Sequence, residues 1–252
     1  MDYIPVAEGR EMSGLRLVLS VGTPGPWSIS ARALFGVRNV PYIPVRQEIG
    51  GANEELVAWT GRRNAPVAVY ESEPAVDNWL DIMVLAERLG RGPSLFPDDP
   101  IDRALAVGFS AEICGQGGFG WSRRLSMMGV APPLEDASLS VIARQYGVRP
   151  DAVRNAPERV IGILRGLSQQ LRRQRAVGSD YLVGDRLSAC DVHWACFSIL
   201  VRPLPPEACS LTAGMRGMFE AMPDELRAAI DPILIEHRDR IWKRYIGLPL
   251  DY

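Results

Sequence analysis

The sequence has few of the residues that usually carry metal, redox or nucleic-acid chemistry. Its 252 residues include two histidines, four cysteines and a single lysine, Lys243, against 27 arginines. The cysteines form no C-x-x-C pair and the histidines no H-E-x-x-H motif, so we expect neither a disulfide framework nor a metal site. The formal net charge of −2 gives no reason to expect a nucleic acid or an anionic lipid as partner.

Long apolar runs are missing as well. No stretch reaches the roughly 20 apolar residues of a membrane helix, and the polar first 14 residues are unlike a signal peptide. Neither a G-x-S-x-G nor a P-loop motif is present. With 47% hydrophobic and 23% charged residues, the chain has a globular composition. We therefore expect a soluble, cytoplasmic protein without a membrane partner.

Residues 15–92 alternate short apolar runs with helical patterns, after an N-terminal extension, 1–14, for which the sequence suggests no role. This alternation predicts a small α/β domain with a mixed sheet. The expected strands are 15–20, 42–45, 66–70 and 75–76, and the expected helices are 28–36, 54–60 and 79–89.

Residues 93–100, P-S-L-F-P-D-D-P, form a proline-rich linker, and the remainder, 101–252, has helical patterns only. The sequence thus predicts an α/β domain followed by an all-helical one. A long, glycine-interrupted helix is expected over 101–128. Further helices are expected at 137–146, 151–175, 188–202, 211–222, 224–230 and 233–245.

The segment from Val18 to Ser28, V-L-S-V-G-T-P-G-P-W-S, indicates a strand, a loop and a helix that opens near Pro26. Proline suits a first helical turn, whose backbone N–H groups lack intrahelical acceptors. Such a helix start favours an anion or a thiolate. The plain alternative is an ordinary connection between a strand and a helix.

A second segment, N-A-P-V, places Pro66 immediately before a strand. Proline is tolerated at the start of a strand, and a cis peptide bond is one option there. A cis bond would leave the main chain of Ala65 open to pair with an extended peptide. An edge strand that simply begins at proline explains the same residues.

A third segment, Asp77-Asn78, precedes the helix that starts at Trp79. Both residues are good N-caps, and capping is the plain interpretation. The functional interpretation is that this helix start, through Asn78, binds the carboxylate of a ligand.

A fourth segment, Y-L-V-G-D-R-L-S-A-C-D, spans Tyr181 to Asp191. Ser188 followed three residues later by Asp191 is a variant of the capping box before an apolar helix. Asp191 would lie in apolar company and would need hydrogen-bond partners. This motif is structural rather than catalytic.

These four segments, in this order, resemble the glutathione transferase family over residues 15–250. Y-L-V-G-D-R-L-S-A-C-D is similar to the family string Y-L-x-G-D-x-(L/F)-(S/T)-x-A-D, A-P-V to its V-P with a cis proline, and D-N-W-L-D-I-M to its E/D-S-x-x-I segment. The resemblance implies a thioredoxin-like N-terminal domain, an all-helical C-terminal domain and glutathione as co-substrate.

The resemblance also implies which residues activate the thiol. Gly25-Pro26-Trp27-Ser28 falls on the family's C-P-Y-C position, where serine and cysteine types carry the activating residue at or near the place of Gly25. Glycine has no donor, so Ser28 and Thr23 are the candidate catalytic hydroxyls. Pro26 and Trp27 are expected to contact glutathione, and the absence of cysteine argues against mixed-disulfide chemistry.

The remaining glutathione contacts follow from the same alignment. Asn78 takes the place of the family serine that binds the γ-glutamyl carboxylate, and an amide can donate there too. Asp77 would face the α-amino group of glutathione. Ala65, before Pro66, would supply main-chain hydrogen bonds.

A substrate pocket is expected along the glycine-rich part of the 101–128 helix. Phe119 and Trp121 are candidate apolar contacts there, and Arg124, or its neighbour Arg123, would meet a carboxylate. The same stretch satisfies G-x-G-x-x-G, with Glu135 about 20 residues on, but without a preceding strand that fingerprint does not predict nucleotide binding.

The leading hypothesis is therefore a glutathione transferase in which the bound thiolate attacks an apolar, electrophilic small molecule, as in detoxification. Isomerase or lyase chemistry with the same thiol stays open, and the resemblance implies a homodimer. The alternative is a non-catalytic binding or protein-interaction module that keeps the fold. Gly25 and Asn78 are the features that favour this alternative.

Overall fold

The computed structural model describes residues 1–130 and 149–252, and their contacts divide them into two units. Met1–Ser94 and Asp251–Tyr252 form the first unit, and Leu95–Leu250 form the second. The division falls inside the proline-rich segment 93–100. The helix expected at 137–146 and Glu135 lie outside the described residues.

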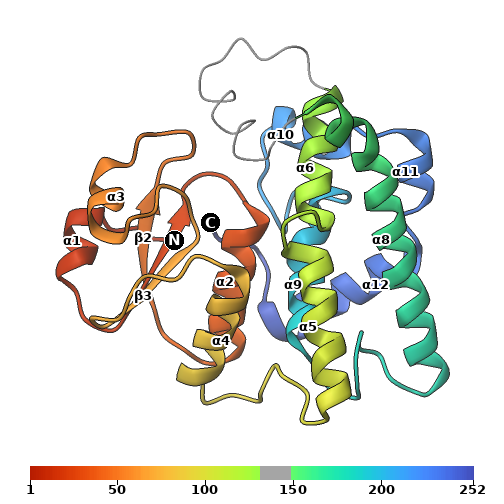
Figure 1. Ribbon diagram of the computed structural model, residues 1–252, viewed down its shortest axis with the longest axis horizontal. Coiled ribbons are helices and arrows are strands. Elements are labelled where there is room, and N and C mark those ends of the chain that lie inside the picture. The colour runs from red at the N-terminus through yellow and green to blue at the C-terminus, as the bar shows by residue number, and fades with distance from the viewer. Residues whose placement is uncertain (131–148) are drawn as a thin grey trace. The chain divides into compact units, whose positions relative to one another are not determined.

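A three-stranded sheet in the order β2-β1-β3 forms the centre of the first unit (Figure 1). β1 (Leu15–Ser20) pairs in parallel with β2 (Ile43–Gln47) and antiparallel with β3 (Val67–Tyr70). All six residues of β1 are buried, because the strand is paired on both edges and covered on both faces. The fourth strand expected at 75–76 is reduced to a single bridge between Val76 and Ala68.

Helices cover both faces of this sheet (Figure 1). α2 (Pro26–Val37) and α4 (Trp79–Leu89) pack against each other, and α2 packs on β1. On the other face lie α1 (Val6–Glu11) and α3 (Glu54–Thr60), which also contact each other. The predicted helices are confirmed to within about two residues at each end, whereas α1 was not expected.

The first 14 residues are therefore part of the sheet unit. Ile4 forms a parallel bridge to Val45, with its N–H 3.0 Å from the carbonyl oxygen of Pro44. Gly9 of α1 lies so close to Val45 that a Cβ there would come within 2.6 Å of its Cγ2. This docking could not be predicted from the sequence, because α1 has only six residues and no side-chain cap.

The described part of the second unit contains helices and no strand. Each of the nine residues of α9 is buried, and α9 packs against α5 and α12. No helix among the described residues is both long and apolar enough to cross a bilayer. The helices are α5 (Pro100–Cys114), α6 (Phe119–Val130), α8 (Pro150–Ala176), α9 (Ala189–Phe197), α10 (Ala213–Glu220), α11 (Asp224–Ala228) and α12 (Pro232–Ile241), with a 3-10 turn at Ser198–Leu200 and a π turn at Trp242–Ile246.

The prediction of a single long helix over 101–128 is wrong, because a glycine turn separates α5 from α6. Gly117 has a φ of +74°, a conformation that favours glycine. A Cβ at Gly115 would lie 2.6 Å from the carbonyl oxygen of Ala111, and one at Gly118 would lie 2.7 Å from that of Glu112. These glycines make a tight turn, and no strand precedes them, so the dinucleotide fingerprint remains excluded.

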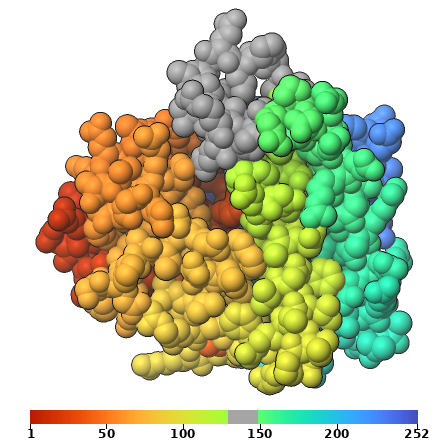
Figure 2. Space-filling model, viewed as in Figure 1, coloured from red at the N-terminus to blue at the C-terminus, as the bar shows by residue number. Residues whose placement is uncertain are grey.

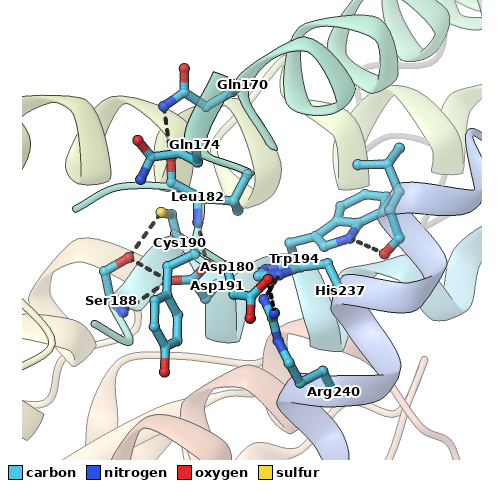
Figure 3. A network of polar contacts seen from close by, with 12 residues as sticks. Gln170, Gln174, Asp180, Leu182, Ser188, Cys190, Asp191, Trp194, His237 and Arg240 are labelled. Atoms are coloured by element: carbon cyan, nitrogen blue, oxygen red, sulfur yellow. Dashed lines mark hydrogen bonds and ion pairs between the residues drawn. The ribbon is translucent and has the colours of Figure 1, made fainter. Parts of the chain in front are cut away.

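The carboxylate of Asp191, buried in α9, joins three segments of the second unit (Figure 3). It accepts the N–H of Leu182 at 2.8 Å, and the N–H and Oγ of Ser188 at 2.9 and 2.7 Å. Nε2 of His237, from α12, lies 3.0 Å from its Oδ1. The capping box predicted from the sequence is present, and it also fixes the preceding loop.

Arg240 determines the tautomer of His237. Its Nη2 lies 3.0 Å from Nδ1 of His237, and a guanidinium can only donate, so Nδ1 is the acceptor. The ring proton is therefore on Nε2, the nitrogen that faces Oδ1 of Asp191. The second terminal nitrogen of Arg240, Nη1, lies 2.7 Å from Oδ1 of Asp180, and this ion pair extends the network from the core to the surface (Figure 3).

His193, fully buried in α9, makes the stability of the second unit depend on pH. Burial lowers the pKa of its imidazole from 6.5 to about 3. Between these values the unfolded chain binds a proton that the folded chain does not. The free energy of unfolding therefore falls as the pH drops below about 6.5, by at most roughly 1.4 kcal/mol per pH unit.

We predict that the free energy of unfolding falls less in His193→Phe than in the wild type between about pH 6.5 and 4.5, as measured by urea unfolding, because phenylalanine has no proton to bind in the unfolded chain. Equal falls in the two proteins would contradict this assignment.

Candidate functional site

Three segments meet at the edge of the sheet where β1 ends. β1 ends at Ser20 and leads through residues 21–25 into α2. Because β3 is antiparallel to β1, the step from Ala65 to Pro66 lies at the same edge. Val76 runs antiparallel to β3, so Asp77-Asn78 also emerges there. The strand directions thus bring together all three unit 1 motifs found in the sequence.

The start of α2 has backbone donors but no side-chain cap. Its N-cap is Gly25, which makes no side-chain hydrogen bond, and its first residue is Pro26. The N–H of Gly25 donates to the carbonyl of Thr23 at 2.8 Å, which makes the loop tight. Because first-turn N–H groups and the helix dipole both favour negative charge, this is a suitable place for an anion.

The two candidate hydroxyls differ in their surroundings. Ser28 is 7% exposed, and its Oγ lies 3.5 Å from the N–H of Ser20, on the side of β1. Thr23 is half-buried in the loop, and its hydroxyl makes no hydrogen bond with the described residues. Of the two hydroxyls, that of Ser28 is occupied on the side of β1, and that of Thr23 is left to the loop before α2. Pro26 is buried and Trp27 is half-buried beside them.

The peptide bond between Ala65 and Pro66 is cis. Ala65 is half-buried, and its main chain makes no hydrogen bond within residues 1–130 and 149–252. Its N–H and C=O are therefore available to an extended peptide lying alongside.

Asp77 is held by a cation that the sequence analysis did not single out. Its Oδ2 lies 3.1 Å from Nε of Arg62, in the loop after α3. The two side chains are 40% and 49% exposed, and such a pair contributes at most about 1 kcal/mol. A ligand with its own amino and carboxylate groups can exchange with it. Only the location of Arg62, three residues before Ala65, could have suggested it.

Asn78 caps α4 with its side-chain oxygen, and its side-chain nitrogen is left as a hydrogen-bond donor. Its Oδ1 accepts the N–H of Leu80 at 2.9 Å, so the capping interpretation is correct for the oxygen. This bond also fixes the orientation of the amide. The side chain is exposed, and its Nδ2 is left to donate to an acceptor at the sheet edge.

The residues expected around a substrate pocket belong to α6, and Phe119 is not suited to that role. It is fully buried and packs edge-to-face on Trp194, with 5.3 Å between ring centroids. Phe119 is a core residue of the second unit, and the sequence-based assignment is corrected accordingly. Trp121, two residues on, is half-buried.

Arg123 and Arg124, which follow Trp121 in α6, differ in their burial and in their partners. Arg123 is fully buried and donates to three carbonyl oxygens, those of Leu200 (3.0 Å), Phe219 (3.0 Å) and Ala221 (2.7 Å). Burial and the neighbouring Arg124 lower its pKa to about 10. It is occupied within the unit and unsuited to a substrate carboxylate. Arg124 is partly exposed and stays the candidate.

The cysteine, histidine and acidic side chains of the described residues are dispersed through the fold. The four cysteines are buried thiols that form no disulfide, and burial raises the pKa of the Cys114 and Cys190 thiols well above the ordinary value. In the described part of the chain, no three His, Cys, Asp or Glu side chains are grouped to hold a metal ion. The sheet edge therefore has polar donors and an anion-favouring helix start as its functional groups.

Comparison with solved structures decides the fold. A glutathione S-transferase domain-containing protein from Marinobacter aquaeolei is 15% identical and superposes with a TM-score of 0.64, covering 92% of this chain and 100% of that one. The chain has the glutathione transferase fold. A glutathione S-transferase from Methylobacterium radiotolerans, in complex with glutathione sulfonate, gives 16% identity and a TM-score of 0.62 over 94% and 97% of the two chains.

A third example of the glutathione transferase fold is Ure2p in complex with S-p-nitrobenzylglutathione. It is 12% identical, with a TM-score of 0.58 over 90% of this chain and 94% of that one. No protein-family model and no curated protein matches the sequence. The fold expected from the four motifs is confirmed by these structures.

Proposed function

We propose that the chain is a glutathione transferase-like enzyme that binds glutathione at the sheet edge and activates its thiol at the start of α2. The observation that carries the proposal is the meeting of three complementary groups. These are the helix start at Pro26, the unpaired main chain of Ala65 and the amide of Asn78. In addition, two of the similar structures contain glutathione derivatives.

Each part of glutathione has a partner in this arrangement. Its peptide backbone pairs with the main chain of Ala65, and its γ-glutamyl carboxylate accepts the Nδ2 proton of Asn78. Its α-amino group replaces Arg62 at the carboxylate of Asp77. The sulfur then lies at the α2 start near Thr23, which stabilises the thiolate after the thiol proton leaves to water.

The thiolate attacks an electrophilic carbon of an apolar small molecule. A carbon–sulfur bond forms, and the electron pair of the broken bond leaves with the leaving group or passes to an adjacent acceptor atom. Isomerase or lyase chemistry begins with the same thiolate, so one activated site serves all three reactions.

The alternative is a non-catalytic binding module with the same fold. Gly25, which has no hydroxyl or thiol, is the observation that favours it. The ion pair of Arg62 with Asp77 would then be a permanent feature of the surface rather than one that a ligand replaces.

Calorimetry with glutathione and with S-hexylglutathione tests the proposal directly, together with ultraviolet titration of the bound thiolate. The enzyme requires binding in the micromolar to low-millimolar range and a thiol pKa below that of free glutathione. Binding with an unshifted pKa favours the module. Absence of binding overturns the proposed function and leaves the fold intact.

Thr23→Val removes the exposed hydroxyl while keeping the side-chain shape. A hydrogen bond to a charged group is worth about 1.5–3 kcal/mol, so we predict that the pKa of the bound thiol rises by about one unit or more. Ser28→Ala is the matched control, because that hydroxyl lies against β1, and we expect the thiol pKa to stay the same. The opposite pattern would assign activation to Ser28.

Asn78→Asp separates ligand binding from helix capping. Aspartate caps a helix as well as asparagine does, so the thermal stability should be unchanged. The donor is lost and a negative charge faces the ligand carboxylate, so we predict at least a tenfold loss of glutathione affinity. Gln116→Glu adds the same charge on the exposed α5–α6 turn and should have no effect. Equal affinities for wild type and Asn78→Asp would remove Asn78 from the site.

A homodimer is part of the proposal, and α5 supports it. Ile101 is 70% exposed and Leu105, one helical turn later, is 45% exposed. Figure 2 shows the α5 segment, in yellow to yellow-green, at the molecular surface. Apolar side chains exposed together on one helix face favour burial against a second copy.

Leu105→Glu should weaken this dimer. A buried, unpaired carboxylate is costly, so we predict that the sedimentation coefficient at micromolar concentration shifts from dimer to monomer. Val177→Glu is the matched control, because Val177 is 78% exposed in the loop after α8. A Leu105→Glu protein that sediments as wild type does would rule out this face.

A further inference from the structure

A separate groove of about 860 Å³ lies in the first unit, at the other end of β1. Its walls come from the α1–β1 turn, the end of α3 and the turn after β3, and α1 and α3 lie side by side here (Figure 1). A volume of this size suits a small molecule. None of the groove's lining residues belongs to the segments 21–28, 65–66 or 77–78 of the candidate glutathione site.

Arg16 is the unusual residue of this groove. It lies in the buried central strand and is only 4% exposed, yet no carboxylate of the described residues is within ion-pair distance of it. Its Nη1 donates to the carbonyl of Gly14 at 2.7 Å, and its Nη2 to the carbonyl of Glu71 at 2.8 Å. Its Nε has no acceptor among the described residues. Buried charges are normally paired, so this one lacks a counter-ion.

The surroundings hold the guanidinium in place. Its Cζ lies 5.7 Å from the ring centroid of Trp59, a cation–π distance. The carbonyl oxygens of Gly14 and Glu71 each accept a hydrogen bond from one of its two terminal nitrogens. The cation is therefore fixed in position before any ligand arrives, which reduces the entropy cost of binding.

The other charges of the groove are mostly neutralised. Glu73 pairs with Arg88, Arg62 pairs with Asp77, and Oε1 of Glu71 accepts the N–H of Gly14 at 3.0 Å. The lining charges without an ion-pair partner in the described residues are those of Arg10, Arg16, Glu11 and Glu71. These four charges sum to zero, so the case for an anion rests on Arg16, which is buried while the other three are exposed.

The remaining lining is apolar and flat. Trp59 and Pro74 border the groove, with Val69 at its base and Met12, 44% exposed, at its rim. We propose that this groove is a second ligand site, which binds a small aromatic carboxylate. The carboxylate is the counter-ion of Arg16 and Arg10, and the ring lies on the apolar part of the lining.

Calorimetry with 2-naphthoate, and with the neutral 2-naphthamide of the same shape, tests the proposal. Naphthoate should bind at least tenfold more tightly than naphthamide, and saturating glutathione should not displace it. Equal affinity of the two probes, no binding up to about 10 mM, or displacement by glutathione would overturn the proposal.

Variants locate the site. Arg16→Gln should weaken naphthoate at least tenfold, but Arg16 also joins Gly14 to Glu71, so two exposed positions keep the test valid if that variant fails to fold. Arg10→Gln should weaken binding several-fold, and Ser13→Trp should block the groove with Arg16 intact. Arg173→Gln, at an exposed arginine of α8, is the control and should change nothing.

Naphthoate affinities within twofold of wild type for both Arg10→Gln and Ser13→Trp would overturn the assignment. The two proposals share Arg62, which lines the groove and pairs with Asp77, so the deciding variants are Arg10→Gln and Ser13→Trp, which leave Arg62 and Thr23 unchanged. Failure of either proposal therefore leaves the other standing.

Discussion

The central strand β1 constrains the whole first unit. It is hydrogen-bonded to a strand on each edge and covered by helices on each face, so its residues have neither a free edge nor a solvent-exposed side. Alternate side chains therefore serve different layers, and Val18 packs with Val45 and Val67 on the α3 face. Both proposed ligand sites follow from this arrangement. The strand's carboxyl end meets the start of α2, and its amino end carries Arg16, the charge that the sheet buries without a counter-ion.

The second unit is organised by two buried charges that are saturated by backbone groups. Asp191 accepts from backbone donors at the start of α9, and Arg123 donates to carbonyls of η1 and of the end of α10. Each charge satisfies polar groups that helix ends would otherwise leave buried and unpaired, which costs about 1–3 kcal/mol per group. This is why charged residues occur in an otherwise apolar core, and why neither is suited to contact a substrate.

At the proposed glutathione site, the activation of the thiol would depend on how many donors reach the sulfur. A thiol pKa lowered by two units needs roughly 2.7 kcal/mol of differential stabilisation. A helix start supplies about 0.3–1 kcal/mol when exposed, and a hydroxyl bonded to a charged group about 1.5–3 kcal/mol. With Gly25 at the N-cap, the helix start alone falls short. Together with Thr23 it reaches the required range, so that loop hydroxyl decides between an enzyme and a passive binding module.

Much of the fold could be predicted from the sequence, because its signals are local. Apolar periodicity placed β1, α3 and α4 to within a residue, and the capping box located the start of α9. The strand directions bring Thr23, Ala65 and Asn78 to one edge of the sheet. Features that depend on neighbours distant in the chain could not be read in this way. The burial of Ser28 and Phe119, the pairing of Arg62 with Asp77 and the docking of residues 1–14 on β2 are of this kind.

The sequence by itself therefore predicted most of the elements and the two-unit organisation, since hydrophobic periodicity, proline, glycine and capping residues act within a few positions of the chain. Its four motifs added the resemblance that implied the glutathione transferase fold. Only the tertiary structure decided which side chains are buried, which are paired and which stay exposed. Burial depends on what packs against a residue, and the same serine, phenylalanine or arginine is a donor, a core residue or an unpaired cation according to the partners that the fold places beside it.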